Sequence, residues 1–168
     1  MDFAVQQMRG KKSILFVCMG NICRSPALGA ALQNSLEQMG KKDALFIDSA
    51  GLTAYYLGQS ADLRMQHAMK KRGIVIDHVA KLFHANDFAR FDCIFAVSKE
   101  VEEHLMGLAR TLEEKKKIQM ATEFSEKYKG EEIPDPYYLG ADAFDHVAEM
   151  VLDAAKGIAK YQCGLLQK

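Results

Sequence analysis

The sequence has no excess of charge of either sign. Its 22 lysine and arginine residues are balanced by 22 aspartate and glutamate residues, so the whole chain creates no field that would attract nucleic acid or an anionic membrane. No apolar run approaches the roughly 20 residues that a membrane helix needs. The start, MDFAVQQMRGKK, lacks the long apolar stretch of a signal peptide. We therefore expect a cytoplasmic protein without a nucleic-acid or membrane partner.

Cysteine is also scarce. The chain has four cysteines in 168 residues, Cys18, Cys23, Cys93 and Cys163. In a reducing compartment we expect them to be thiols rather than a disulfide framework. No C-x2-C or H-x3-H pair is present, which argues against a structural zinc site. The sequence therefore predicts neither a metal nor another cofactor.

Short apolar segments alternate along the chain with segments of helical periodicity. Strands are predicted over 13–17, 44–49, 93–97 and 117–121, and helices over 26–39, 59–72, 86–90, 98–106 and 141–161. Residues 77–83 are weakly extended and 133–140 form a loop. This order predicts an α/β fold, a doubly wound, mostly parallel four-stranded sheet flanked by helices. We expect residues 1–12 to be a flexible extension and 13–168 a single domain.

The segment VCMGNICRSP, over 17–26, joins the first predicted strand to the first helix. Ligands bind at the carboxyl ends of strands in doubly wound sheets. Backbone N–H groups and the helix dipole at such a place favour an anion. We therefore expect a phosphate-binding loop made of Met19, Gly20, Asn21, Ile22 and Cys23. Gly20 permits close approach to the anion, and Asn21 tolerates a left-handed conformation.

Cys18 and Arg24 flank this loop. The field that favours an anion also favours the nucleophilic thiolate form of Cys18. The planar fork of Arg24 can hold two phosphate oxygens into the transition state. Ser25 is placed to donate a hydrogen bond to the Cys18 sulfur when that sulfur becomes the leaving group. The pattern predicts phosphate-ester chemistry through a phosphocysteine, and a buried cysteine beside a surface arginine is the alternative.

Phosphoryl transfer from an ester also needs a general acid for the leaving oxygen. Asp135 is the candidate, because Pro134 and Pro136 stiffen the loop around it. Its local sequence alone favours an ordinary turn aspartate. The neighbouring Tyr137 and Tyr138 support the acid role, since two aromatic rings could sandwich an aromatic leaving group. Simple packing is the alternative for both tyrosines.

These motifs together resemble the low-molecular-weight protein tyrosine phosphatases. VCMGNICRSP is similar to the family's phosphate loop, DSAG to the end of its second strand and PDPYY to its acid loop. The spacing of residues 58–64 and 91–95 is also similar, and the resemblance covers the chain from 13 to about 161. It implies a phosphatase that acts on phosphotyrosine in proteins and on small aryl phosphates.

For the reacting groups, the resemblance implies Cys18 as the nucleophile and Arg24 as the clamp on the transition state. Asp135 would act first as the acid and then as the base that activates water. Ser25 would stabilise the Cys18 thiolate. No metal is needed, because Arg24 and the loop amides carry the charge.

For the supporting groups, the resemblance implies that Asn21, Ser49 and His78 hold the loop in shape. A solvated loop histidine is an equal alternative for His78. Tyr55 would occupy an aromatic site on the pocket wall, facing the two tyrosines that follow the acid. A monomer or a weak homodimer is expected.

Cys23 resembles the family's second loop cysteine, which is able to form a reversible disulfide with Cys18 under oxidation. A buried bystander thiol is the alternative for Cys23. A thiol redox sensor built on the two cysteines is a further interpretation, best taken as a way of regulating a phosphatase.

The sequence departs from the family pattern at four positions, three of them within 97–101 and one in the first helix. Val97-Ser98 and Val101 stand where the family usually has Met-Asp and, three residues after the Asp, an Asn. The family's Asp supports the active-site arginine, so its loss bears on full activity and on the pH profile. Gly29 replaces a usual Glu in the first helix, which should mainly cost helix stability.

Three alternatives to a tyrosine phosphatase are open. An arsenate reductase of the same fold needs a further redox cysteine pair, for which Cys93 and Cys163 are poorly placed. A phosphoarginine phosphatase has a threonine where this loop has Ile22, and its acid loop lacks the second tyrosine. A phosphotyrosine-binding pseudo-enzyme is supported only by Ser98.

Overall fold

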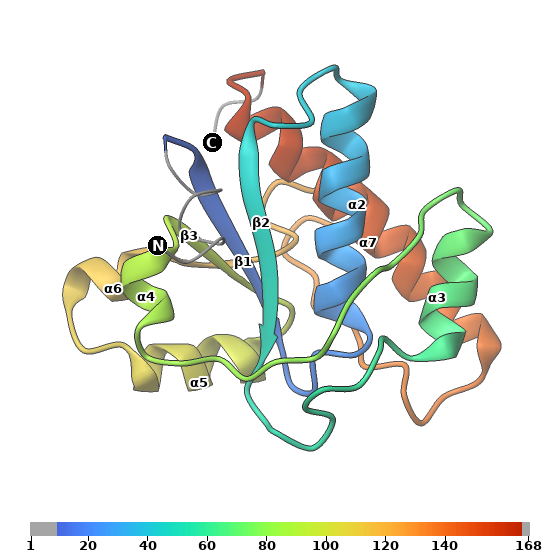
Figure 1. Ribbon diagram of the computed structural model, residues 1–168, viewed down its shortest axis with the longest axis horizontal. Coiled ribbons are helices and arrows are strands. Elements are labelled where there is room, and N and C mark those ends of the chain that lie inside the picture. Colours follow the sequence, from blue (N-terminus) through green and yellow to red (C-terminus); the bar gives the residue numbers. More distant parts are fainter. Residues whose placement is uncertain (1–9, 166–168) are drawn as a thin grey trace.

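A computed structural model describes residues 10–165 of the chain (Figure 1). Residues 1–9 of the predicted extension, and residues 166–168, lie outside the described residues. The strands are β1 (Lys12–Cys18), β2 (Leu45–Gly51), β3 (Cys93–Ala96) and β4 (Ile118–Met120). Neighbouring strands are all parallel, in the order β2-β1-β3-β4. The predicted fold class is confirmed, although β1 begins one residue early, within the predicted extension.

Helices lie on both sides of the sheet. They are α2 (Arg24–Gln38), α3 (Leu63–Lys70), α4 (Asp87–Arg90), α5 (Lys99–Leu108), α6 (Leu112–Lys116) and α7 (Ala141–Gln162). The helices α2, α3 and α7 lie on one side, and α4, α5 and α6 on the other (Figure 1). Because both faces are covered, β3 is wholly buried and β1 is buried after its first residue.

Two helices differ from the sequence prediction. α3 begins at Leu63 rather than at 59, because residues 58–60 pair with 79–80 instead of coiling. Asp62 then caps the helix, and its carboxylate accepts the Arg64 N–H at 2.8 Å. α6 was not predicted at all. The other boundaries lie within two residues of the predicted ones.

The core forms where β1 and β3 meet the helices. Phe16 and Phe95 are fully buried on these neighbouring strands, with ring centroids 5.6 Å apart. On α7, a stripe at helical spacing is buried: Phe144, Val147, Val151, Ala155 and Ile158. This packing fixes the carboxyl end of β1 against the start of α2.

Candidate active site

A pocket of about 180 Å³ opens where β1 ends and α2 begins. It is lined by Cys18, Met19, Gly20, Asn21, Ile22, Cys23, Arg24, Thr53, Tyr55, Tyr56, Asp135, Tyr137 and Tyr138. The phosphate loop, the segment after β2 and the loop around Asp135 (the acid loop, 133–140) meet there. A larger groove of about 520 Å³ lies between α2 and residues 73–78, but neither cysteine nor arginine lines it. The predicted chemistry therefore belongs to the smaller pocket.

Cys18 is the last residue of β1 and is only 3% exposed. Its Sγ lies 2.9 Å from Ser25 Oγ and accepts the Asn21 backbone N–H at 3.2 Å. Asn21 Nδ2 donates to Ser25 Oγ at 2.8 Å, so the Ser25 hydroxyl can direct its own proton at the sulfur. Two donors thus converge on Sγ, at the amino end of α2, and such donors stabilise a thiolate.

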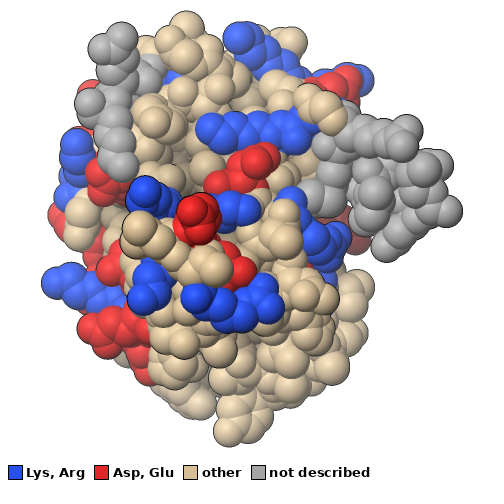
Figure 2. All heavy atoms as spheres, turned by 90° about the vertical axis from the view of Figure 1, so that its left-hand side faces the viewer, with Lys and Arg blue, Asp and Glu red and all other residues tan. Residues whose placement is uncertain are grey.

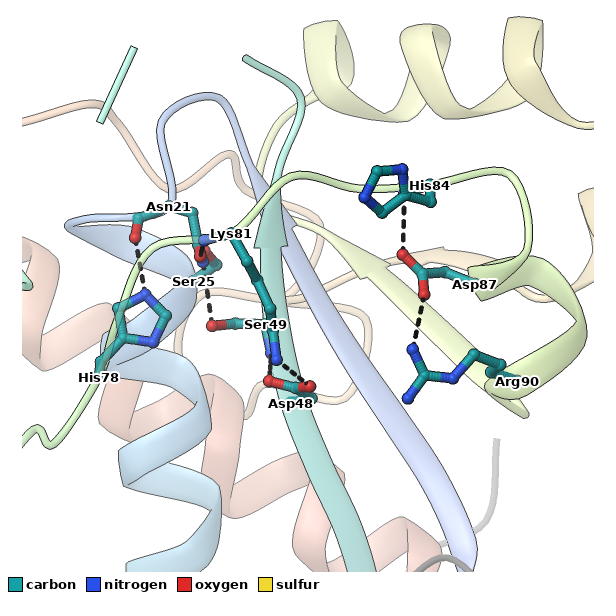
Figure 3. A network of polar contacts seen from close by, with 9 residues as sticks. All are labelled: Asn21, Ser25, Asp48, Ser49, His78, Lys81, His84, Asp87 and Arg90. Atoms are coloured by element: carbon teal, nitrogen blue, oxygen red, sulfur yellow. Dashed lines mark hydrogen bonds and ion pairs between the residues drawn. The ribbon is translucent and has the colours of Figure 1, made fainter. Parts of the chain in front are cut away.

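Asn21 lies at the centre of a network of polar contacts beside the loop (Figure 3). Its φ of 57° is left-handed, as the sequence analysis allowed. Its Nδ2 also donates to Ser49 Oγ at 3.0 Å, and its Oδ1 accepts the Lys81 N–H at 2.9 Å. Its carbonyl oxygen lies 2.8 Å from His78 Nε2. The structure therefore brings the predicted trio of Asn21, Ser49 and His78 together. The contact with the Lys81 backbone was not predicted.

The tautomer of His78 follows from its partner. A carbonyl oxygen only accepts, so the proton that bonds Asn21 must sit on His78 Nε2. Burial lowers the pKa of His78 from its ordinary value, and the bond to Asn21 partly offsets this. Nearby, Lys81 Nζ forms an ion pair with Asp48, whose Oδ1 accepts the Ser49 N–H at 2.8 Å.

Arg24 reaches from α2 to the acid loop. It is 6% exposed, and its Nη1 donates to Ile133 O at 3.1 Å. Its Nη2 lies 3.8 Å from Asp135 Oδ2. The Asp135 side chain is 51% exposed, and its Oδ1 accepts the Tyr137 N–H at 3.1 Å. An acid and a buried cation therefore stand together over the pocket.

Ser98, one of the unusual residues, serves as a helix cap. Its Oγ accepts the Val101 N–H at 3.3 Å at the start of α5. The buried support of Arg24 comes from backbone instead. Ile133, whose carbonyl binds Arg24, donates its own N–H to Val97 O at 2.9 Å. Val97, the residue after β3, thus positions Arg24 through Ile133 without a side-chain carboxylate at 98.

The aromatic wall differs in detail from the prediction. Tyr55 lines the pocket but is 84% exposed, whereas the Tyr56 ring packs on Tyr137 with centroids 5.6 Å apart. Tyr138 packs edge-on against Tyr137, at 4.9 Å. A Cβ on Gly20 would lie 2.8 Å from the Tyr56 ring, so this glycine makes room for Tyr56. Sequence reasoning missed Tyr56, since nothing in the Tyr55-Tyr56 pair says which ring turns inward.

Cys23 is buried in the loop. Burial above all, and then the Asp62 carboxylate, raise the pKa of its thiol. Both Cys18 and Cys23 are free thiols in the structure. A disulfide between them stays a prediction.

The comparisons with known proteins agree with this geometry. A family model described as low molecular weight phosphotyrosine protein phosphatase matches residues 13–163. The low molecular weight phosphotyrosine protein phosphatase of Rattus norvegicus is 36% identical over 150 residues, which cover 88% of this chain and 93% of that protein.

The chain belongs to this family.

Solved structures of similar proteins have the same fold. A protein tyrosine phosphatase from Entamoeba histolytica superposes with a TM-score of 0.86 at 36% identity, covering 93% of this chain and all of that one. A Drosophila arginine phosphatase superposes with a TM-score of 0.80 at 30% identity, covering 88% of this chain and 96% of that one. The fold is therefore shared by phosphatases named for tyrosine and for arginine, so the choice between these substrates must depend on the pocket.

Among the described residues, no group of three or more His, Cys, Asp or Glu side chains could hold a metal ion. Within 10–165, no helix is long and apolar enough to cross a membrane. Cys93, which the arsenate reductase alternative would need near Cys18, pairs in register with Ile14, at the opposite end of β1. Cys163 follows α7, whose 22 residues carry it about 33 Å away from the acid loop.

Proposed function

We propose that this phosphatase family member hydrolyses phosphotyrosine in proteins, and small aryl phosphates, through a phosphocysteine. The observation that carries the proposal is the placement of Cys18 Sγ, with two donors on it, in one pocket with buried Arg24 and with Asp135. A nucleophile, a cation for the phosphate oxygens and a proton donor are what transfer from an ester requires.

In the first step, the Cys18 thiolate attacks phosphorus, the S–P bond forms and the aryl O–P bond breaks. Protonated Asp135 gives its proton to the leaving oxygen, so that a neutral phenol departs. Arg24 and the loop N–H groups stabilise the charge on the three equatorial oxygens. The fixed geometry of Asn21 keeps those N–H groups aimed at the phosphate.

In the second step, water attacks the phosphocysteine and the S–P bond breaks. Asp135, now a carboxylate, takes a proton from the water. Ser25 stabilises the departing thiolate through its hydroxyl, which lies 2.9 Å from Sγ. Inorganic phosphate leaves, and the enzyme returns to its starting state.

The pocket wall supports an aryl substrate. The rings of Tyr56, Tyr137 and Tyr138 stand around the opening, and aromatic rings pack well against a phenyl leaving group. Phosphoarginine hydrolysis is the second candidate within the fold, but Ile22 offers no hydroxyl to a guanidinium group.

The proposal also covers partner and location. We propose a phosphotyrosine-containing protein as the partner, no nucleic acid or membrane, a monomer or weak homodimer, and a cytoplasmic location. On the side of α4, α5 and α6, basic and acidic side chains are interspersed rather than sorted by sign (Figure 2), which supports the exclusion of nucleic acid there. The four free cysteines fit a reducing compartment. Residues 13–168 form the proposed single domain.

The test is hydrolysis of p-nitrophenyl phosphate in the presence of a chelator, from about pH 4 to about pH 9. We expect a rate that peaks on the acid side and is lost in Cys18→Ser but kept in the matched control Cys93→Ser. A Cys18→Ser enzyme with the wild-type rate would refute the mechanism. No rate with phosphate still bound would indicate a pseudo-enzyme, and faster hydrolysis of phosphoarginine than of phosphotyrosine peptides would favour the second candidate.

A further inference from the structure

Arg64 lies outside the pocket, at the second residue of α3, yet it contacts the acid loop. Its Nε and Nη2 donate to the two carboxylate oxygens of Asp62, at 3.0 and 2.8 Å. Its Nη1 donates to the backbone carbonyl of Tyr137 at 3.0 Å. Every nitrogen of the guanidinium is therefore engaged, in a planar fork that a lysine could not reproduce.

Packing keeps this fork in place. The Arg64 Cζ lies 5.2 Å from the centroid of the Tyr137 ring and 4.6 Å from that of Phe144. Phe144 is buried on α7, and the Asp62 side chain is only 10% exposed. Cation–π contacts of this kind favour a fixed guanidinium. Arg64 thus joins α3, α7 and the acid loop at one point.

Asp62, which binds Arg64, also contacts the phosphate loop. The backbone N–H of Asp62 donates to Ile22 O at 2.8 Å, within the loop that wraps the anion. The carboxylate of the same residue holds Arg64. Asp62 therefore connects Arg64, and through it the acid loop, directly to the phosphate loop.

Tyr137 connects Arg64 to Asp135, the proposed general acid. Its N–H donates to Asp135 Oδ1 at 3.1 Å, while its carbonyl accepts from Arg64. On the other side of Asp135, the Ile133 carbonyl is held by Arg24 at 3.1 Å. Two arginines therefore bind the carbonyls two residues before and two residues after Asp135, and of the two only Arg24 lines the pocket.

We propose that Arg64, braced by Asp62, is a positioning residue for the general acid: through Tyr137 it fixes Asp135 relative to the phosphate loop. The inference rests on the proposed function, because it assigns Arg64 a role in protonating the leaving group. Arg64 does not touch the substrate, so its effect depends on how much the leaving group needs a proton.

The test is kcat/KM across aryl phosphates, from p-nitrophenyl phosphate, with a good leaving group, to phenyl phosphate, with a poor one. We expect nearly equal values in the wild type, because Asp135 protonates each leaving oxygen. In Arg64→Gln, kcat/KM for phenyl phosphate should fall about tenfold or more, while that for p-nitrophenyl phosphate changes little. Arg64→Lys should recover only part of the loss.

Two comparisons separate positioning from a general structural effect. Arg110 forms a similar fork, with Glu114 on the far side of the sheet, and Arg110→Gln should leave every substrate unaffected. In an Asp135→Asn background, Arg64→Gln should cause no further fall for phenyl phosphate. Equal losses for all leaving groups, or additive losses in the double variant, would overturn the proposal.

Failure of the proposed function would look different. If kcat/KM of Asp135→Asn stays nearly equal for all the aryl phosphates, or if no hydrolysis depends on Cys18, Asp135 is not the general acid. The positioning role proposed for Arg64 then fails as well. Should Arg64→Gln not fold, Asp62→Asn carries the test, because an asparagine keeps the capping oxygen but loses the charge that holds Arg64. It should show the same selective loss for phenyl phosphate.

Discussion

At the scale of single residues, Ser25 is expected to act on the second chemical step. Its hydroxyl accepts from Asn21 Nδ2, so its proton is available to the Cys18 sulfur. Loss of one hydrogen bond to a developing thiolate should slow breakdown of the phosphocysteine about tenfold in Ser25→Ala. Rapid-quench kinetics with p-nitrophenyl phosphate should then reveal a burst of p-nitrophenol and a larger fraction of trapped phosphoenzyme.

Ser98→Ala is the matched control for this prediction, because within residues 10–165 the Ser98 Oγ bonds only the Val101 N–H that it caps. It should cost about 1 kcal/mol of stability and change the burst little. A Ser25→Ala enzyme without extra phosphoenzyme would show that the hydroxyl does not serve the leaving sulfur.

His78 provides a prediction about pH. Burial lowers its pKa in the folded state, so the unfolded chain takes up this proton first as the pH falls. The stability that His78 contributes is therefore fully present above the unfolded value of about 6.5 and declines as the pH falls through the lower folded pKa. Urea unfolding at about pH 7.5 and about pH 5.5 should show a smaller acid-side loss in His78→Gln than in the wild type. Parallel losses in the two proteins would contradict this.

The sequence could predict that the three residues of the proposed chemistry meet, but it could predict their neighbours only in part. Cys18, Arg24 and Asp135 are set by local motifs, and the structure places them in one pocket. Tyr56 could not be chosen over Tyr55, because the choice depends on the space that Gly20 leaves. Arg64 could not be linked to the acid loop, since their contact joins residues 73 positions apart.

At the scale of elements, the contact of α7 with the segment after β4 depends on one glycine. A Cβ on Gly157 would lie 1.9 Å from the Phe124 carbonyl oxygen, which the backbone must move to avoid. We expect Gly157→Ala to lower the free energy of unfolding by about 3 kcal/mol or more. Chemical denaturation followed by circular dichroism measures this change.

Gly107 on α5 is the matched control, because a Cβ there would meet no atom within 4 Å. Gly107→Ala should stabilise the protein by about 0.5–1 kcal/mol, since alanine is the better helix former. If the two substitutions had similar effects, close packing at Gly157 would not be the cause.

Helices were predictable where they bury a periodic stripe, as α7 does. α6 is five residues long and buries no side chain, so it leaves no hydrophobic pattern to detect. The start of α3 was placed too early for a different reason. Residues 58–60 pair with 79–80, and a contact across that distance has no local signal.

At the scale of the whole molecule, the pocket joins three parts of the chain that the fold brings together: the phosphate loop, the segment after β2 and the acid loop. An anion that binds Arg24 and the loop amides should therefore stabilise the entire fold rather than one loop. Inorganic phosphate, the product, is the simplest such ligand. At a hundred times its Kd it should add about 2.7 kcal/mol to the free energy of unfolding.

For a chain of this size, that stabilisation corresponds to a rise in Tm of about 5–10 °C. Thermal unfolding at increasing phosphate concentration should show the rise in the wild type and in Arg90→Gln, whose arginine pairs with Asp87 on α4. Arg24→Gln, compared with its own phosphate-free Tm, should lose most of it, because Arg24 is the buried cation of the pocket. An equal rise in the Tm of Arg24→Gln would mean that phosphate binds elsewhere on the surface, and that the pocket is not the anion site.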